Sequence, residues 1–255
     1  MCGRFVLATK PSAFVDQFTE DPEADENHLH LSAREMSDIQ EQVKRLDADF
    51  EPRYNVAPTT SIPAIARYKD DDLMIANFKW GLVPYWAKDT SFAAKCFNAR
   101  AESIGEKPTF KDAYRRSRCV IFADGYYEWK PTAAKTKQPY FVHLKDSSPM
   151  FFAGICEPKT GTAAIVTMEA QDKMRELHHR RPVFLKADEV LEWLDPKADA
   201  SDLEGLIQSS QDKDWGVVNL WWVFVFLSFG WFYAAFWSCC CGVRYPIVEC
   251  RRSVL

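Results

Sequence analysis

The chain has 255 residues, enough for a sizeable hydrophobic core, and its composition is that of an ordinary globular protein, which excludes wholesale disorder. Its formal net charge of −4 does not point to nucleic acid, yet residues 95–137 carry ten Lys and Arg against five Asp and Glu. Because local patches rather than the net charge set the attraction to phosphate, the composition is compatible with DNA binding.

The eight cysteines are not arranged as a disulfide or zinc framework. Four are widely spaced and four lie near the end of the chain, with no CxxC pair and no Cys/His spacing suited to zinc. The N-terminus lacks the basic leader and apolar run of a signal peptide. We therefore expect an intracellular, reducing setting, with no metal and no organic cofactor.

Cys2 is the first residue with chemistry of its own. If Met1 is removed, Cys2 carries both a thiol with a pKa of roughly 8.5 and an α-amine with a pKa near ~8. An amine can form a Schiff base with an aldehyde, and the adjacent thiol can then close a five-membered thiazolidine. From the opening residues alone, a chance early cysteine is the simpler interpretation.

Helical and strand patterns then follow one another along the chain. An acidic, polar stretch at about residues 20–50 is interpreted as a surface insertion that contains a helical run at 32–46. The other expected helices lie at residues 13–18, 110–118, 171–177, 188–194 and 203–209. The expected strands lie at residues 62–68, 73–80, 118–130, 140–144, 151–155 and 162–168.

Segment 80–86 is dense in aromatic residues and is interrupted by Gly81 and Pro84. Spacing alone favours a core turn with two buried tryptophans. The alternative is an aromatic platform for bases, where each stacked base contributes about 1–3 kcal/mol.

Further on, Asn98 and Arg100 are two residues apart on an extended segment, so they should share a face. That arrangement suits one group for a sugar and one for a phosphate, although such triplets also occur by chance.

Glu128 follows a buried strand and stands among three aromatic residues. A carboxylate in such company loses hydration, which suits a general acid or base, whereas an outward-facing Glu on an edge strand is the equal alternative.

In segment 178–182, a histidine beside two arginines suits proton transfer next to phosphate anchors. A structural turn explains that segment equally well.

The combination of these motifs is more specific than any one of them. In their order along the chain they resemble the SRAP family, named as SOS-response-associated peptidases, whose members shield abasic sites in single-stranded DNA. The resemblance covers residue 2 to about residue 210 and rests on segments 2–5, 53–58, 80–86, 98–102, 123–130 and 178–182.

This resemblance implies an α+β fold with curved antiparallel β-sheets that form a barrel-like core, a DNA groove and peripheral helices. It also implies a function. After Met1 is removed, Cys2 forms a thiazolidine cross-link to the ring-opened abasic sugar, in single-stranded DNA and at replication forks. The family name implies a peptidase that releases Met1 itself, with an aminopeptidase as the alternative, and a lyase activity through the Cys2 amine is a further expectation.

The resemblance also assigns roles to individual residues. Asn98 positions Cys2 and the sugar, Glu128 shuttles protons, and His178 is the general acid toward the sugar oxygen. The residues expected to contact DNA are Arg4, Trp80, Pro84, Trp86, Arg100, Arg180 and Arg181. We expect a monomer, nuclear in a eukaryote and cytoplasmic in a bacterium.

The end of the chain departs from the family pattern. We expect an SRAP domain at residues 1–212 and an atypical hydrophobic tail at 213–255. Residues 217–243 contain no charged side chain and are long enough for a membrane span, which would make a membrane a partner. A mis-spliced or frame-shifted gene model is the favoured explanation, because a membrane tether does not suit a DNA-repair domain. A genuine tail would leave the final core strand missing.

Two other functions use the same features. An N-terminal-nucleophile cysteine hydrolase or peptidase would use Cys2 to cleave amides. A non-catalytic single-strand DNA-binding protein would bind equally well with or without an abasic aldehyde.

Overall fold

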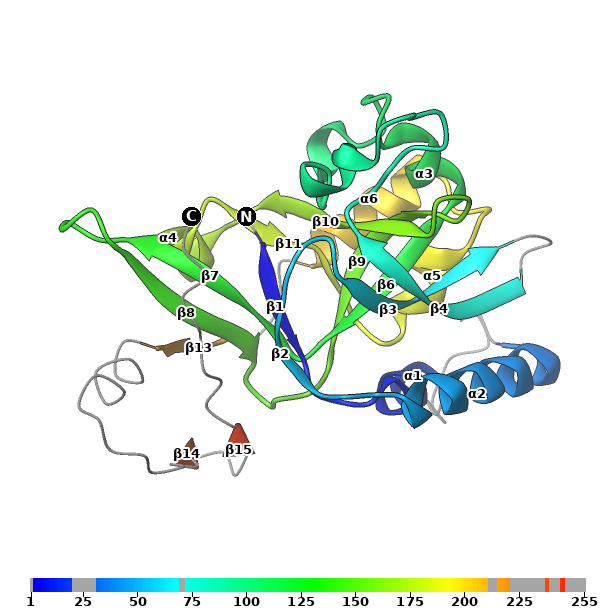
Figure 1. Ribbon diagram of the computed structural model, residues 1–255, viewed down its shortest axis with the longest axis horizontal. Coiled ribbons are helices and arrows are strands. Elements are labelled where there is room, and N and C mark those ends of the chain that lie inside the picture. The colour runs from blue at the N-terminus through cyan, green and yellow to red at the C-terminus, as the bar shows by residue number, and fades with distance from the viewer. Residues whose placement is uncertain are drawn as a thin grey trace.

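The computed structural model describes residues 2–19, 31–68, 72–210, 215–220, 237–238 and 244–245 (Figure 1). Within these ranges, helices lie around the edges of two large sheets, so the predicted α+β class is confirmed. A two-stranded ladder of β14 (Trp237–Ser238) and β15 (Arg244–Tyr245) completes the described strands.

The first sheet has five antiparallel strands and contains the N-terminal strand in its interior. In spatial order its strands are β13 (Trp215–Asn219), β8 (Lys137–Leu144), β7 (Gly125–Pro131), β1 (Arg4–Leu7) and β2 (Arg53–Val56).

The second sheet has eight strands, of which five close into a ring because β10 pairs with both β4 and β9. β10 runs parallel to β4 and to β5. The other strand pairs of this sheet are antiparallel, so the prediction of antiparallel sheets is confirmed apart from these two pairs. The strands are β3 (Ser61–Tyr68), β4 (Asp72–Trp80), β5 (Asn98–Arg100), β6 (Arg118–Ala123), β9 (Met150–Glu157), β10 (Thr162–Glu169), β11 (Arg180–Pro182) and β12 (Phe184–Leu185).

The helices are short except for α2, and they lie at the periphery, as expected (Figure 1). They are α1 (Pro11–Thr19), α2 (Ala33–Ala48), α3 (Lys111–Arg116), α4 (Asp172–Leu177), α5 (Glu189–Leu194) and α6 (Ala200–Ser209), with 3-10 turns η1 (Thr90–Ala94) and η2 (Ala101–Ser103).

Helix α2 shows why the acidic stretch folds. Ser32 and Glu35 form a capping box, in which each side chain accepts a hydrogen bond from the backbone N–H of the other residue. One face buries Ile39 and Val43, while Gln42 Oε1 accepts from the backbone N–H of Ile75 at 2.7 Å. The part of the predicted insertion that the structure describes is therefore packed against β4 at its helix.

The N-terminal strand is fixed by packing on both sides. Phe5 is fully buried, opposite Val56 on β2 and Tyr126 on β7. Beyond the end of β1, Asp124 Oδ2 accepts from the backbone N–H groups of Ala8 and Thr9. Because β1 is interior to its sheet, the residues just before it are held against the core.

A late strand is present beyond residue 212. β13 pairs with β8 along its length, from Trp215 opposite Leu144 to Asn219 opposite Tyr140. The expectation that a genuine tail would leave the sheet without its last strand is therefore corrected. The predicted span at 217–243 begins inside this strand and otherwise falls almost wholly outside the described residues. Among the described residues, no helix has the length and apolar character needed to cross a membrane.

Candidate active site

Cys2 is fully buried at the start of β1 and is held by Asn98. Asn98 Nδ2 donates to the Cys2 carbonyl oxygen at 2.7 Å, across 96 residues of sequence. Strand β5 positions Asn98 by pairing it with Ile165 on β10. Asn98 Oδ1, in the same amide group, is buried without a hydrogen-bond partner among the described residues. The site thus keeps one free acceptor beside the residue that becomes the N-terminus when Met1 leaves.

The environment of Cys2 suppresses its thiolate. Burial raises the pKa of the Cys2 thiol well above its usual range, and the charge of Glu128 raises it further. The thiol is therefore protonated at neutral pH, and a base must accept its proton before the sulfur can attack. Glu128 is the nearby carboxylate that can do so.

Glu128 lies on an interior strand rather than on an edge, since β7 has β8 on one side and β1 on the other. Its side chain is 6% exposed, which excludes the outward-facing alternative. Tyr126, two residues earlier, points to the same face and is 1% exposed. Burial raises the pKa of Tyr126, and the charges of Cys2 and Glu128 raise it further, so this hydroxyl belongs to the same site.

His178 completes the group. It ends helix α4, and its Nδ1 lies 4.0 Å from Glu128 Oε2. Burial lowers the pKa of His178, and the opposing charge of Glu128 offsets part of that effect. The imidazole is therefore neutral at neutral pH and becomes a proton donor in mild acid. The structure brings together the four residues that the sequence motifs assign to catalysis, namely Cys2, Asn98, Glu128 and His178.

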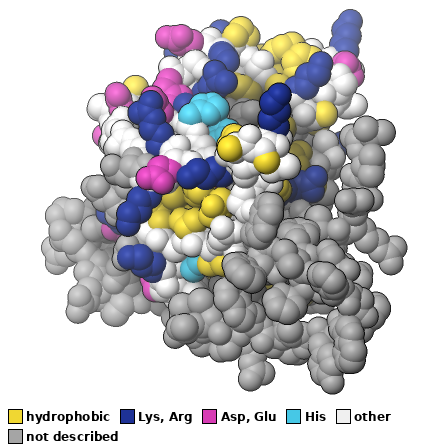
Figure 2. Space-filling model, turned by 90° about the vertical axis from the view of Figure 1, so that its left-hand side faces the viewer, with side chains coloured by type: hydrophobic (Ala, Val, Ile, Leu, Met, Phe, Trp, Pro, Cys, Tyr) yellow, Lys and Arg dark blue, Asp and Glu magenta, His cyan; other side chains and the backbone are white. Residues whose placement is uncertain are grey.

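Arg4 and Arg100, two of the residues predicted to contact DNA, are both at least partly exposed. Ala99 is buried between Asn98 and Arg100, so those two residues share the outer face of β5, as predicted. Arg100 is exposed and has no hydrogen-bond or ion-pair partner among the described residues. Arg4 is half-buried, and its Nη1 donates to Asn55 Oδ1 at 3.3 Å. On the left-hand face of Figure 1, seen from the front in Figure 2, Lys and Arg side chains surround His and apolar side chains.

The aromatic segment divides between the core and the surface. Tyr85 and Trp86 are 55% and 47% exposed, whereas Pro84 is buried behind them. Gly81 makes this turn possible, because its φ is +139° and a Cβ there would lie 2.2 Å from the carbonyl oxygen of Ala93. The exposed rings provide an apolar, stackable surface; the sequence motif contained Tyr85, but the prediction omitted it.

The placement of Trp80 corrects the sequence prediction. Its side chain is fully buried, its ring meets Phe5 edge-on at 5.1 Å, and its Nε1 donates to the Phe97 carbonyl at 2.8 Å. A residue in this position packs against the turn from inside the core, and its buried ring is not available for stacking with a base. The expected platform therefore consists of Trp86 and Tyr85.

Arg180 and Arg181 are likewise turned inward. Arg180 is 9% exposed and forms two bonds to the carboxylate of Glu102. Arg181 is 2% exposed, and both of its terminal nitrogens donate to Ser210. In this conformation both guanidinium groups are engaged by other groups of the protein, and their contact with DNA stays a prediction.

Several residues of the site escaped sequence reasoning. Tyr126 had a usable signal, since it stands two positions before Glu128 on one strand. Glu102 stood inside a recognised motif but without an assigned partner. Thr167 carried no signal, because its part is to bind the Arg180 side chain and the Ala99 carbonyl. No cluster of three or more potential metal ligands lies in the described parts of the chain.

Comparison with known proteins identifies the family. The sequence model of the SOS response associated peptidase (SRAP) family matches residues 1–220. The abasic site processing protein YoaM of Bacillus subtilis is 36% identical over 209 residues, covering 79% of this chain and 82% of that protein. YedK of Escherichia coli, also named an abasic site processing protein, is 31% identical over 202 residues, covering 76% and 79%. A crystal structure from Bacteroides thetaiotaomicron has the same fold, with a TM-score of 0.63 at 22% identity over 86% of this chain and 91% of that one. The chain therefore belongs to the SRAP family.

Proposed function

We propose that this protein processes abasic sites in single-stranded DNA by forming a covalent cross-link through Cys2 after Met1 has been removed. One observation carries the proposal. Asn98 holds the Cys2 carbonyl at 2.7 Å within a group that also contains a buried carboxylate and a histidine 4.0 Å from it. The relatives YoaM and YedK are named abasic site processing proteins, which supports the same substrate class here.

The chemistry follows from the groups present. His178 protonates the ring oxygen of the abasic sugar and the C1′ hydroxyl loses its proton to water, so the bond between C1′ and the ring oxygen breaks and C1′ becomes an aldehyde. The Cys2 amine attacks that carbon, and loss of one water gives the imine. The Cys2 sulfur then adds to the imine carbon while its proton passes to the imine nitrogen by way of Glu128. The net change at C1′ is one C–N bond and one C–S bond formed, with both C1′–O bonds broken: the ring oxygen becomes a hydroxyl and the C1′ oxygen leaves as one water.

The buried setting favours the thiazolidine over the competing hydrolase function. A cysteine hydrolase depends on a thiolate that a neighbouring positive charge stabilises. Cys2 instead faces the carboxylate of Glu128, which raises the pKa of its thiol. A protonated thiol that gives up its proton only as it attacks an imine fits this environment better.

The DNA is expected to lie along the exposed side of the site. Arg4 and Arg100 would hold phosphates on either side of the abasic sugar, with Trp86 and Tyr85 stacking against a neighbouring base. The same substrate arises in exposed template strands at replication forks. Release of Met1 by the chain itself, and strand cleavage by β-elimination from the Cys2 imine, are secondary activities of this proposal.

A denaturing gel tests the proposal. The full chain, shown by mass to begin at Cys2, is mixed with a single-stranded oligonucleotide that carries one abasic site. We expect a slow-migrating, heat-stable band that is absent for Cys2→Ser and for an oligonucleotide without the lesion. A band of equal intensity with Cys2→Ser would contradict the proposal. Equal binding to both oligonucleotides without any band would instead support a non-catalytic DNA-binding protein.

A further inference from the structure

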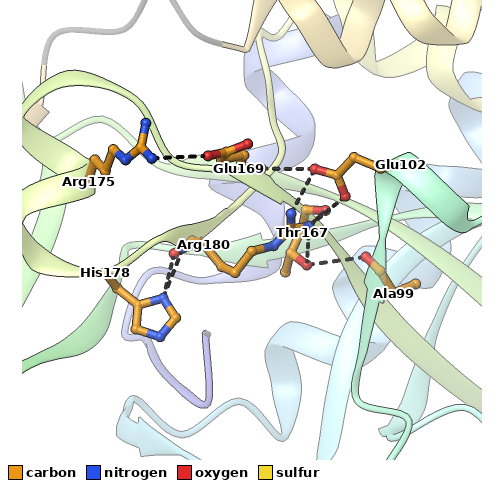
Figure 3. A network of polar contacts seen from close by, with 7 residues as sticks. All are labelled: Ala99, Glu102, Thr167, Glu169, Arg175, His178 and Arg180. Atoms are coloured by element: carbon orange, nitrogen blue, oxygen red, sulfur yellow. Dashed lines mark hydrogen bonds and ion pairs between the residues drawn. The ribbon is translucent and has the colours of Figure 1, made fainter.

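The backbone of Arg180 is the direct partner of the His178 ring. The Arg180 N–H donates to His178 Nδ1 at 2.9 Å, and the Arg180 carbonyl oxygen lies 3.2 Å from the same nitrogen (Figure 3). In the neutral ring, Nδ1 accepts from the N–H, which leaves the proton on Nε2. In the imidazolium, Nδ1–H faces the Arg180 carbonyl, with Glu128 Oε2 at 4.0 Å. The Arg180 peptide therefore orients the ring in both protonation states.

The Arg180 side chain, itself 10% exposed, is in turn held by Glu102 and Thr167. Nη1 donates to Glu102 Oε1 at 2.7 Å and Nη2 donates to Glu102 Oε2 at 2.9 Å, a bidentate pair of fixed geometry. Nη2 also donates to the carbonyl oxygen of Thr167 at 2.5 Å. With its terminal nitrogens engaged, the guanidinium retains only Nε, which is buried and has no partner among the described residues.

Glu102 is itself fixed in place. Its Oε1 accepts from the backbone N–H of Glu169 at 3.1 Å (Figure 3). Burial opposes the ionisation of Glu102, but the hydrogen bonds and the charge of Arg180 outweigh burial and lower the pKa of this carboxyl below its usual range. Glu102 lies in η2, directly after the strand that carries Asn98. The ion pair thus joins the segment of Asn98 to the segment of His178.

We propose that Arg180 is a positioning residue: its ion pair with Glu102 fixes the imidazole of His178 opposite Glu128 and ties that histidine to the Asn98 strand. The inference rests on the proposed function for the catalytic role of His178. It assigns Arg180 an internal role in place of a contact with the DNA backbone. A lysine cannot replace it, since a single ammonium cannot make the bidentate pair and the Thr167 bond in the same geometry.

Two variants of the full chain test this role. Glu102→Gln preserves shape and removes the charge, and because the Glu102 side chain is 51% exposed, we expect this variant to fold. Arg180→Lys replaces the planar guanidinium, which makes two hydrogen bonds to one carboxylate, with a single ammonium. In both variants, at a pH below the pKa of His178, we expect the cross-linking rate at saturating DNA to fall by about 10- to 100-fold, since a small displacement of a reacting group has effects of that size. The affinity for DNA without the lesion should not change.

The pH dependence separates positioning from general support of the fold. NMR titration of the His178 ring, assigned by its loss in His178→Gln, measures the pKa directly. Burial lowers this pKa in the native site, so a loosened and better hydrated ring should titrate at higher pH in both variants. The pH at which the cross-linking rate begins to fall should rise by the same amount as the pKa of His178.

Arg175→Ala is the matched control. Arg175 belongs to the same cluster, 3.6 Å from Glu169, but its side chain is 67% exposed and its guanidinium reaches Glu169 rather than His178 (Figure 3). This variant should keep the native rate and the native titration of His178.

Three results would overturn the inference. One is an unchanged His178 titration and rate in Glu102→Gln, which decides the matter even if Arg180→Lys does not fold. Another is a loss of DNA affinity with a shallower salt dependence in Arg180→Gln, which removes the positive charge; that result would show a direct phosphate contact. The third is an effect of Arg175→Ala equal to that of Glu102→Gln. If the native protein forms no cross-link, the proposed function fails, while the titration still decides whether Arg180 positions His178.

Discussion

Strand β10 separates two arginines that look alike in the sequence and differ in the structure. On one side, Thr167 pairs with Arg100 of β5, whose side chain is exposed and has no partner among the described residues. On the other side, Glu169 pairs with Arg180 of β11, whose guanidinium is buried in contacts with Glu102 and Thr167. An arginine in a DNA-binding motif is available to phosphate only when the protein has not already used its donors.

The same contrast extends to the rest of the site. Cys2, Glu128 and Arg180 are buried and should govern the rate of reaction once DNA is bound. Arg100 and Trp86 are exposed and should govern affinity and its salt dependence. A variant of a buried residue that changed DNA affinity, or a variant of an exposed residue that changed the rate at saturating DNA, would contradict this division.

The largest effect is expected for Glu128→Gln. The amide cannot accept the Cys2 proton, so cross-linking should slow by about 10²- to 10⁴-fold, the usual contribution of a general acid or base. Affinity for undamaged single-stranded DNA should stay within a factor of two or so of native, because the carboxylate is buried. Single-turnover kinetics at saturating DNA measure the rate, and a native rate would rule out the proton-transfer role.

Next is Trp86→Ala, which removes an exposed ring. If a base stacks there, binding should weaken by about 1–3 kcal/mol, with little change in rate at saturation. Trp80→Phe is the informative comparison, because Trp80 is buried and the change removes its bond to the Phe97 carbonyl and part of its packed ring. It should lower the melting temperature and leave DNA affinity intact. Fluorescence anisotropy with labelled oligonucleotide measures both affinities, and the reverse pattern would show that the wrong tryptophan has been assigned.

A smaller effect is expected for Arg100→Ala. Loss of one phosphate contact should lower the slope of log affinity against log salt by about 0.7, the value for single-stranded DNA. Arg180→Gln, which also removes a positive charge, should leave that slope unchanged. DNA-binding titrations at several salt concentrations measure the slopes of both variants. Equal slopes for Arg100→Ala and the native protein would show that Arg100 does not contact DNA.

The smallest effect at neutral pH concerns His178. A general acid must be protonated to act, and burial lowers the pKa of His178 below its ordinary value. Its contribution should therefore be largest in mild acid and should be lost as pH rises through that lowered pKa. The ratio of the native rate to the His178→Gln rate should be greatest below pH ~6.5 and approach one above it. A ratio that rises with pH would contradict the acid role.

Local patterns in the sequence predicted part of this arrangement. The helix after Ser32 and the shared face of Asn98 and Arg100 follow from short-range rules, and both appear in the structure. The α+β class and the grouping of Cys2 with Glu128 came from the resemblance to the SRAP family.

Other features depend on partners distant in sequence. Arg180 is buried because Glu102, 78 residues earlier, receives it. Within β4 the buried positions change phase, from Leu73 and Ile75 to Phe78 and Trp80, so alternation alone could not place Trp80. β13 belongs to the sheet through its pairing with β8, whereas its apolar sequence was taken as the start of a membrane span.

The intact mass of the cross-linked product tests the central claim most directly. The account predicts the mass of the chain without Met1, plus that of the abasic oligonucleotide, minus one water, in a product that forms without reductant and survives heating. A product that retains Met1, or one that appears only after borohydride reduction, would contradict attack by the Cys2 amine and thiol together. The second outcome would point to a simple Schiff base in place of the thiazolidine.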